Sequence, residues 1–404
     1  MSLRDRLIRA LHPTLHVTGG NEVALLTNGH TYFPALTAAI REARETIRIE
    51  TYLYADDALG DLITTELCHA ASRGVDVRLV VDGFGAMNID RRHLSTLNEA
   101  GVHVRIFRPE AGWLRHLLRL KTTRLRRMHR KIAVFDGQLA FVGGINIIGD
   151  ETGNFSPIRL DFVVRISGPL VTEIVYAVDH QWMTLERLVR RFVTRTHQLS
   201  GRTPIHAEPA GDYRAAFLLR DNLLHRTRIQ RAYARAISHA NHEIILAMAY
   251  FIPSRQILGA LLEAAKRGVH IRLLLQGRVE YALQHYASQA IYIRLLRAGI
   301  RIFEYQPGFM HAKAGVIDGR WATIGSANLD PFSLLVAREA NVIVHDSRFC
   351  NELRQQILGI MSQESKEIVA SEWQARPWFK HALRQMAASV LFRLLSLTRY
   401  ASNY

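Results

Sequence analysis

The chain is poor in cysteine and in long apolar stretches, and both shortages limit what it can be. Only Cys68 and Cys350 occur among its 404 residues, and they lie far apart. A disulfide framework and a cysteine zinc site are therefore not expected, and a reducing compartment suits the chain. No run reaches the roughly 18 apolar residues that cross a bilayer, and the first residues lack the apolar region of a signal peptide.

Motifs of several common enzyme classes are also missing. The sequence contains no Gly-x-Ser-x-Gly, no His-Glu-x-x-His and no complete phosphate-binding glycine loop. These absences remove the usual lipase, zinc-hydrolase and nucleotide interpretations. Acidic residues are outnumbered, with 36 Asp and Glu against 52 Lys and Arg and a formal charge of +16. This excess predicts a polyanionic partner, either a phospholipid surface or a nucleic acid.

What the chain does contain is one short signature in two copies. The first copy has His129, Lys131, Asp136, Gly143-Gly144 and Asn146; the second has His311, Lys313, Asp318, Gly325-Ser326 and Asn328. In both copies the asparagine follows the histidine by 17 residues. A lone His-x-Lys occurs by accident on any basic surface, whereas six positions repeated at identical spacing are a strong signal.

In these motifs the chain resembles the phospholipase D superfamily, whose two His-x-Lys motifs build one shared active site. Within it, the likeness is greatest to bacterial cardiolipin synthases of the B type. It covers about residues 20 to 365 and rests on three further stretches. These stretches are Ile49 to Tyr52 with Asp56-Asp57, then Arg220-Asp221-Asn222, and finally Ser326 to Pro331.

Phosphodiester chemistry explains why these residue types are needed. An anionic phosphodiester resists attack until its oxygens are neutralised, a role that fits Lys131, Lys313 and the amides of Asn146 and Asn328. One histidine must be neutral to attack and another protonated to release the alcohol. The resemblance implies a covalent phosphohistidine on His129, with His311 as acid and then base. Symmetry alone permits the reverse order.

Four carboxylates accompany the two motifs. Asp161 and Glu339 follow His129 and His311 by 32 and 28 residues. The resemblance implies that these acids orient the histidines across the pseudo-dyad, where each would fix a tautomer. It also implies that Asp136 and Asp318, which we count with the catalytic motif, tie the motif loops together. The implied mechanism needs no metal and no cofactor.

An internal repeat predicts the architecture. Segments such as Arg73-Gly74-Val75 and Arg267-Gly268-Val269 recur at an offset of 194 to 198 residues. Each repeat reads as helix, apolar strand, helix, Arg-Gly-Val and strand, and the branched strands 75–81 and 269–275 are typical of buried parallel strands. We therefore expect an α/β fold, with two pseudo-symmetric phospholipase D-like lobes, each a mixed sheet flanked by helices, that share one active site at their interface. The expected divisions are 1–200, 201–370 and a basic amphipathic tail at 371–404, with a linker at 197–213.

The first lobe carries about 16 extra residues before its motif. From Gly101 to His129 is 28 residues, but from Gly299 to His311 is only 12. This insertion, at about residues 110–127, mixes bulky apolar side chains with cations, which favours contact with an anionic lipid surface. An ordinary lid packed on its own protein remains the alternative. The expected lipid-binding residues are Trp113, Arg115, Arg119, Lys121, Arg124, Arg126 and Arg127.

These observations predict an enzyme that makes cardiolipin. It would transfer a phosphatidyl group from one phospholipid, phosphatidylglycerol, to the hydroxyl of a second phosphatidylglycerol. We expect it to act at an anionic phospholipid membrane, as a peripheral protein on the cytoplasmic side of the cell inner membrane, without nucleic acid. Three alternatives stay open: a phospholipase D that transfers to water, a nuclease of the same superfamily, and a basic membrane-binding module whose motifs are relics. The oligomeric state is not predicted.

Overall fold

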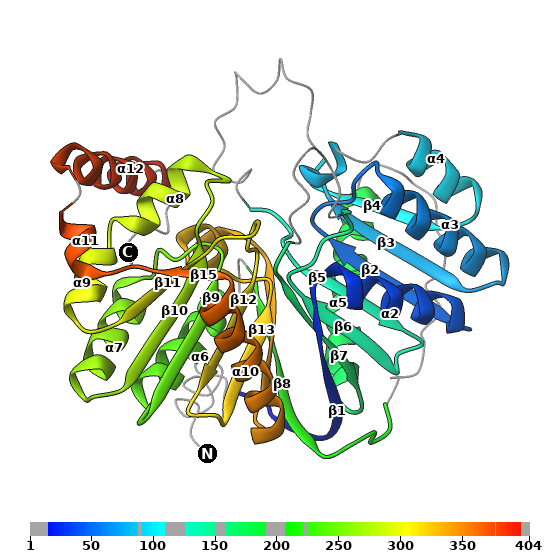
Figure 1. Ribbon diagram of the computed structural model, residues 1–404. Helices are drawn as coiled ribbons and strands as arrows, with labels where there is room; N and C mark the ends of the chain where they lie inside the picture. The colour runs from blue at the N-terminus through cyan, green and yellow to red at the C-terminus, as the bar shows by residue number, and fades with distance from the viewer. Residues whose placement is uncertain are drawn as a thin grey trace, which may run out of the picture.

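The computed structural model describes residues 15–87, 91–109, 126–149, 159–190, 207–221, 225–375 and 377–396. Within these residues, fifteen strands form one continuous mixed sheet in the order β15-β11-β10-β9-β12-β13-β14-β8-β1-β7-β6-β5-β2-β3-β4. At its centre β1 (Thr18–Thr27) pairs antiparallel with β8 (Tyr213–Arg220). This pairing joins two halves that lie side by side (Figure 1).

The two halves contain matching elements. The strands of the first half are β2 (Thr46–Thr51), β3 (Asp76–Asp82), β4 (His103–Phe107), β5 (Lys131–Phe135), β6 (Leu139–Gly143) and β7 (Phe162–Ser167). Those of the second half are β9 (Glu243–Met248), β10 (His270–Gln276), β11 (Arg301–Tyr305), β12 (Lys313–Ile317), β13 (Trp321–Gly325), β14 (Glu339–Val344) and the additional β15 (Ser365–Glu367). The first-half helices are α2 (Asn28–Glu42), α3 (Ala58–Ser72), α4 (Arg91–Glu99) and α5 (Leu170–Arg190). The second-half helices are α6 (Arg228–Ser238), α7 (Arg255–Lys266), α8 (Ala282–Gln289), α9 (Tyr292–Arg297), α10 (Ser347–Gln363), α11 (Ala370–Gln374) and α12 (Trp378–Ser396).

The predicted repeat is confirmed. The run α2-β2-α3-β3 is matched by α6-β9-α7-β10, and β3 and β10 each lie between two parallel neighbours. The two Arg-Gly-Val segments directly follow α3 and α7. Gly74 and Gly268 adopt φ of +89° and +87°, a left-handed conformation that ends a helix and favours glycine. The guanidinium groups of Arg73 and Arg267 donate to backbone carbonyls at the C-terminal ends of α2 and α6, respectively.

Three apolar layers hold the sheet and its helices together. The central core lies on the inner faces of both halves and includes one side each of α5 and α10. Two outer cores lie under α2, α3 and α4 in the first half and under α6, α7 and α9 in the second. Because the central core takes residues from both halves, the halves pack as one body, which fixes the ends of β5 and β12 relative to each other.

The predicted tail contains two helices, α11 and α12. Most of the predicted linker lies outside the described residues, and its end leads into β8. The proposed divisions at residues 200 and 370 stay predictions. Among the described helices, none is long and apolar enough to cross a membrane.

Candidate active site

The two motif histidines stand together where the halves meet. Each lies two residues before a central strand, His129 before β5 and His311 before β12. Their ring centroids are 6.2 Å apart. The preceding residues are anchored alike, because the Met128 N–H donates to Asp82 over 2.7 Å and the Met310 N–H donates to Gln276 over 2.8 Å.

Each histidine is paired with a carboxylate of the other half. His129 Nδ1 lies 3.1 Å from Glu339 Oε2, and His311 Nδ1 lies 2.8 Å from Asp161 Oδ2. The backbone sets this crossing. The N–H of His129 donates to the carbonyl of Arg338 over 2.9 Å, and the N–H of His311 donates to that of Leu160 over 2.8 Å. Since Nδ1 is engaged on both rings, Nε2 is the nitrogen left for substrate.

The lysines and asparagines of the motifs surround the same point. Lys131 and Lys313 are buried, and each ammonium donates to the carbonyl of its own motif histidine. Asn146 and Asn328 are buried as well. The Oδ1 of Asn146 accepts the N–H of Leu53 over 3.1 Å, while the Oδ1 of Asn328 has no hydrogen-bond partner among the described residues. Two buried cations beside two histidines form a site for a phosphate-type anion.

Asp136 and Asp318, which the sequence analysis counts with the catalytic motif, lie away from the two histidines. They follow the far ends of β5 and β12, five residues from the lysines. Asp136 accepts the backbone N–H groups of residues 44, 45 and 46, and Asp318 those of residues 241, 242 and 243. Their φ values of +50° and +51° belong to the β5-β6 and β12-β13 turns. They fix the backbone at the start of β2 and of β9, which agrees with the loop-tying role that the resemblance implied.

A substitution separates this structural role from a chemical one. We expect Asp136→Ala to destabilise the fold by about 1–3 kcal/mol, because it leaves three N–H groups without their acceptor. Thermal unfolding measures this change. Turnover of the protein that remains folded should stay within about threefold of wild type, whereas Lys131→Ala should keep the stability and lose the turnover. A reversed pattern would return Asp136 to the catalytic set.

Burial and the two lysines set the charges of the histidines. Burial lowers the pKa of His129, although Glu339 opposes the shift, and burial with Lys313 and Lys131 lowers the pKa of His311 well below its usual value. Burial raises the pKa of Asp161 to about 6. Burial acts on Glu339 in the same sense, but His129 and Lys131 outweigh it and lower its pKa. The two pairs therefore differ: Glu339 stays ionised, and Asp161 can take up a proton near neutrality.

This difference predicts an acid limit to activity. An ionised Asp161 is needed to stabilise a protonated His311. Because the pKa of Asp161 is about 6, activity should fall as the pH drops through that value, where the carboxyl group becomes neutral. A profile of kcat against pH measures this fall. In Asp161→Asn we expect a low kcat that no longer falls as the pH drops through about 6. An unchanged fall in Asp161→Asn would assign it to another group.

Aromatic residues complete the wall and were not predicted as site residues. The ring of Tyr52 meets that of His129 edge-on at 5.0 Å, lies 5.3 Å from Lys131 Nζ and stacks on Phe84. In the second half the counterpart of Tyr52 is Ala249, and the next residue, Tyr250, donates its hydroxyl to Glu280 over 2.7 Å. The signal that could have found Tyr52 is its place in the stretch Ile49 to Tyr52, which carries part of the family resemblance.

Of the six motif positions, one differs between the two copies, and it is buried in both. A Cβ atom on Gly144 would lie 2.3 Å from the carboxylate of Asp161, so only glycine fits there. Its counterpart Ser326 donates a 2.5 Å hydrogen bond to Glu339. Asp161 thus lies against a glycine, whereas Glu339 lies against a serine. The serine adds a donor that favours the ionised form of Glu339.

The predicted lipid-binding insertion is almost wholly outside the described residues, which include only Arg126 and Arg127 of that set. Arg127 Nη1 lies 3.6 Å from the buried Asp82, and its side chain is 17% exposed. The lipid-binding role of Arg127 stays a prediction. The roles of the other insertion residues stay predictions.

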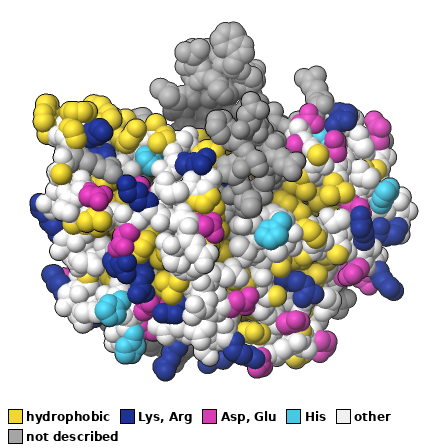
Figure 2. All heavy atoms as spheres, in the orientation of Figure 1, with side chains coloured by type: hydrophobic (Ala, Val, Ile, Leu, Met, Phe, Trp, Pro, Cys, Tyr) yellow, Lys and Arg dark blue, Asp and Glu magenta, His cyan; other side chains and the backbone are white. Residues whose placement is uncertain are grey.

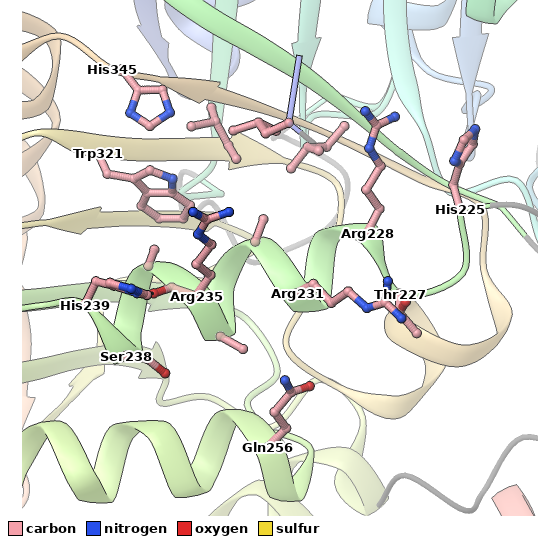
Figure 3. A pocket seen from close by; sticks show the side chains of 16 residues that line it. His225, Thr227, Arg228, Arg231, Arg235, Ser238, His239, Gln256, Trp321 and His345 are labelled. Atoms are coloured by element: carbon pink, nitrogen blue, oxygen red, sulfur yellow. The ribbon is translucent and has the colours of Figure 1, made fainter. Parts of the chain in front are cut away.

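Two other features contain none of the motif residues. A cavity of about 910 Å³ lies beside α6, and Figure 3 shows Arg228 and Arg235 rising from that helix toward the side of Trp321 and His345. In the described part of the chain, one group could hold a metal ion, namely Asp56, Asp61 and His93. Arg92 already binds both of these carboxylates.

Known proteins resemble this chain in sequence. A family model described as cardiolipin synthase, phospholipase D-like domain, matches residues 36–172 and 233–361. The chain is 36% identical to cardiolipin synthase B of Salmonella typhimurium over 382 residues, 92% of this chain and 90% of that protein. It is 35% identical to cardiolipin synthase B of Escherichia coli strain K12 over 381 residues, with the same shares covered.

A solved structure agrees in fold. Phosphatidylserine synthase of Haemophilus influenzae superposes with a TM-score of 0.71 at 13% identity, over 98% of this chain and 99% of that one. The extent of the family match and the near-complete coverage of the relatives confirm the family resemblance. The chain belongs to the cardiolipin synthase family of phospholipase D-like proteins.

Proposed function

We propose that this chain makes cardiolipin from two molecules of phosphatidylglycerol, with release of glycerol. The observation that carries the proposal is the crossed pairing of the two histidines, His129 with Glu339 and His311 with Asp161. It provides two imidazoles in one site with different carboxylate partners, which is what a two-step transfer at phosphorus requires.

In the first step, Nε2 of His129 attacks the phosphorus of the donor lipid. A P–N bond forms, the P–O bond to the glycerol headgroup breaks, and His311 gives its proton to the departing oxygen. Lys131 and Lys313 neutralise the phosphate oxygens. The phosphorylated ring of His129 is cationic while its Nδ1 keeps a proton, and the ionised Glu339 stabilises that charge.

In the second step, His311 removes the proton from a headgroup hydroxyl of the second phosphatidylglycerol. The hydroxyl oxygen attacks phosphorus, the P–N bond breaks and neutral His129 returns. His311 must gain and lose one proton per cycle, and two features favour this. The anionic substrate offsets the lysine charges that lower the pKa of His311, and Asp161 ionises near neutrality.

The setting is part of the proposal. The enzyme works as a peripheral protein at an anionic phospholipid membrane, on the cytoplasmic side of the inner membrane, and takes no nucleic acid. The formal charge of +16 supports attraction to such a surface. The family membership supports a phospholipid substrate.

Product analysis tests the acceptor. Purified protein incubated with phosphatidylglycerol vesicles should form cardiolipin and glycerol in equal amounts, with phosphatidic acid as a minor product. Phosphatidic acid as the main product would make the chain a hydrolytic phospholipase D. Cleavage of single-stranded DNA at comparable efficiency would make it a nuclease. His129→Ala serves as the control for contaminating activity, and release of neither product by the wild type would favour a binding module.

A further inference from the structure

The exposed large apolar side chains of the described residues are unevenly distributed. Five of these eleven side chains belong to the single helix α12. Figure 2 shows apolar side chains gathered at the corner of the molecule where Figure 1 places α12. We call this group the α12 stripe, and its members are Trp378, Phe379, Leu383, Met386 and Val390.

The α12 stripe is not the face with which the helix packs on the protein. Leu391 and Ala387 are buried, and Leu391 packs with Ile252, Ala287 and Phe332. Four stripe residues, 379, 383, 386 and 390, follow the spacing that aligns side chains along one side of a helix. Successive residues turn by about 100°, so this line lies about a third of a turn from Leu391. The helix thus carries two apolar faces, one packed and one exposed.

The packed face ties α12 to the catalytic centre. Phe332 belongs to the short π-helix Phe332–Val336, which begins four residues after the motif residue Asn328. The same side of α12 packs on α8, where Arg384 Nε donates to Gln289 over 3.0 Å. Two residues before α8, Glu280 accepts the hydroxyl of Tyr250 and acts on the charge of Lys313. The helix therefore sits on a wall of the active site.

Exposed apolar side chains also lie near the site on both halves. Val279 and Tyr281 flank Glu280 and are 48% and 58% exposed. In the first half Phe84, 46% exposed, stacks on Tyr52 beside His129. Exposed apolar side chains thus occur both on α12 and beside residues of the catalytic wall. Surface of this kind beside a reactive centre marks an interaction site.

We propose that the α12 stripe inserts into the lipid bilayer and so holds the catalytic site at the membrane surface. The inference rests on the proposed function, because it names the surface through which that site meets its lipid. Trp378, 80% exposed, and Phe379 would reach the boundary between headgroups and acyl chains, where aromatic rings partition well. Substrate lipid would then enter without leaving the membrane.

The charge of this region favours an anionic bilayer over a second copy of the chain. Residues 373–404 contain no Asp or Glu, while Lys380 and Arg393 are exposed on α12. A symmetric dimer through this helix would set the same cations against each other. Anionic headgroups would instead pair with them.

Vesicle binding tests the stripe apart from catalysis. The full chain carrying His129→Ala, which cannot turn over, is compared with the same chain carrying Phe379→Ser, Leu383→Ser and Met386→Ser. Vesicles are phosphatidylglycerol mixed with phosphatidylcholine, and sedimentation gives the bound fraction. We expect the triple variant to bind at least about 100-fold more weakly, since three apolar side chains no longer leave water. Tyr176→Ser, which removes an aromatic ring on α5 that is 71% exposed and so more exposed than any of the three, is the control and should bind as before.

Activity of the chain with His129 intact gives the second measurement. The triple variant should lose activity on vesicles in proportion to its binding, yet keep within about twofold its activity on monomeric short-chain phosphatidylglycerol. Its melting temperature should be unchanged, because the substituted side chains are exposed. Equal binding by the triple variant overturns the inference. A dimer in sedimentation velocity that the triple variant abolishes, with vesicle binding intact, assigns the stripe to a second copy. Stripe-dependent binding without cardiolipin synthesis would overturn the proposed function alone.

Discussion

The variant His129→Ala should form no phosphoenzyme and should lose about 10⁴-fold or more of its activity, because the proposed mechanism places the covalent intermediate on this histidine. Wild-type protein mixed with radiolabelled phosphatidylglycerol and quenched within milliseconds should carry an acid-labile, base-stable label. The label should be absent from His129→Ala. We place the covalent step on His129 because the carboxylate paired with its Nδ1, Glu339, is the one that stays ionised.

The matched variant is His311→Ala. It keeps the nucleophile but lacks the group that protonates the leaving alcohol, so it should form label slowly and then retain it, since no base activates the acceptor. A substrate whose leaving group needs no proton should restore the first step in His311→Ala and not in His129→Ala. Label on His129→Ala, together with none on His311→Ala, would reverse the two roles.

The second large effect is expected at Glu339. In Glu339→Gln the amide nearly preserves the shape of the side chain but loses the charge, so the histidine can adopt the wrong tautomer and its phosphorylated form is no longer stabilised. We expect kcat to fall about 10³-fold with KM changed less than threefold. Circular dichroism should show the same fold, and phosphoenzyme trapping should show a smaller steady-state label than in wild type.

Asp161→Asn is the comparison variant, because it acts on the other histidine. It should slow both protonation of the leaving alcohol and activation of the acceptor, so the label should not fall as it does in Glu339→Gln. The double variant should lose less than the product of the two single losses, since both carboxylates serve one site. Equal label in the two single variants would mean that the carboxylates do not divide their work between the histidines.

The sequence predicted the architecture because its repeat is regular. Strand β3 begins one residue after the predicted start at Val75, and β10 one residue after Val269. In both halves a glycine with positive φ marks the end of the helix before the strand. Local signals of this kind depend on neighbours in the chain, so they can be read without the fold.

The site was predictable only in part. The motif spacing identified His129 and His311, and the family resemblance supplied the crossed partners Glu339 and Asp161, which the geometry now joins. The loop-tying role of Asp136 came from the resemblance, because a motif alone does not reveal that the five residues of β5 separate Asp136 from His129. The contacts of Tyr52, and which face of the predicted amphipathic tail is packed and which is exposed, depend on residues that meet across the fold, and no local pattern records that.

The difference between Gly144 and Ser326 has an evolutionary meaning. In a homodimer built from one repeat, each substitution appears in both halves of the site, so a serine that supports one carboxylate would also stand where Asp161 leaves no room for a Cβ atom. Joining the repeats in one chain through β1 and β8 removes that constraint. A duplicated ancestor could then accept a change beside one histidine without suffering it beside the other, and the two copies became free to specialise.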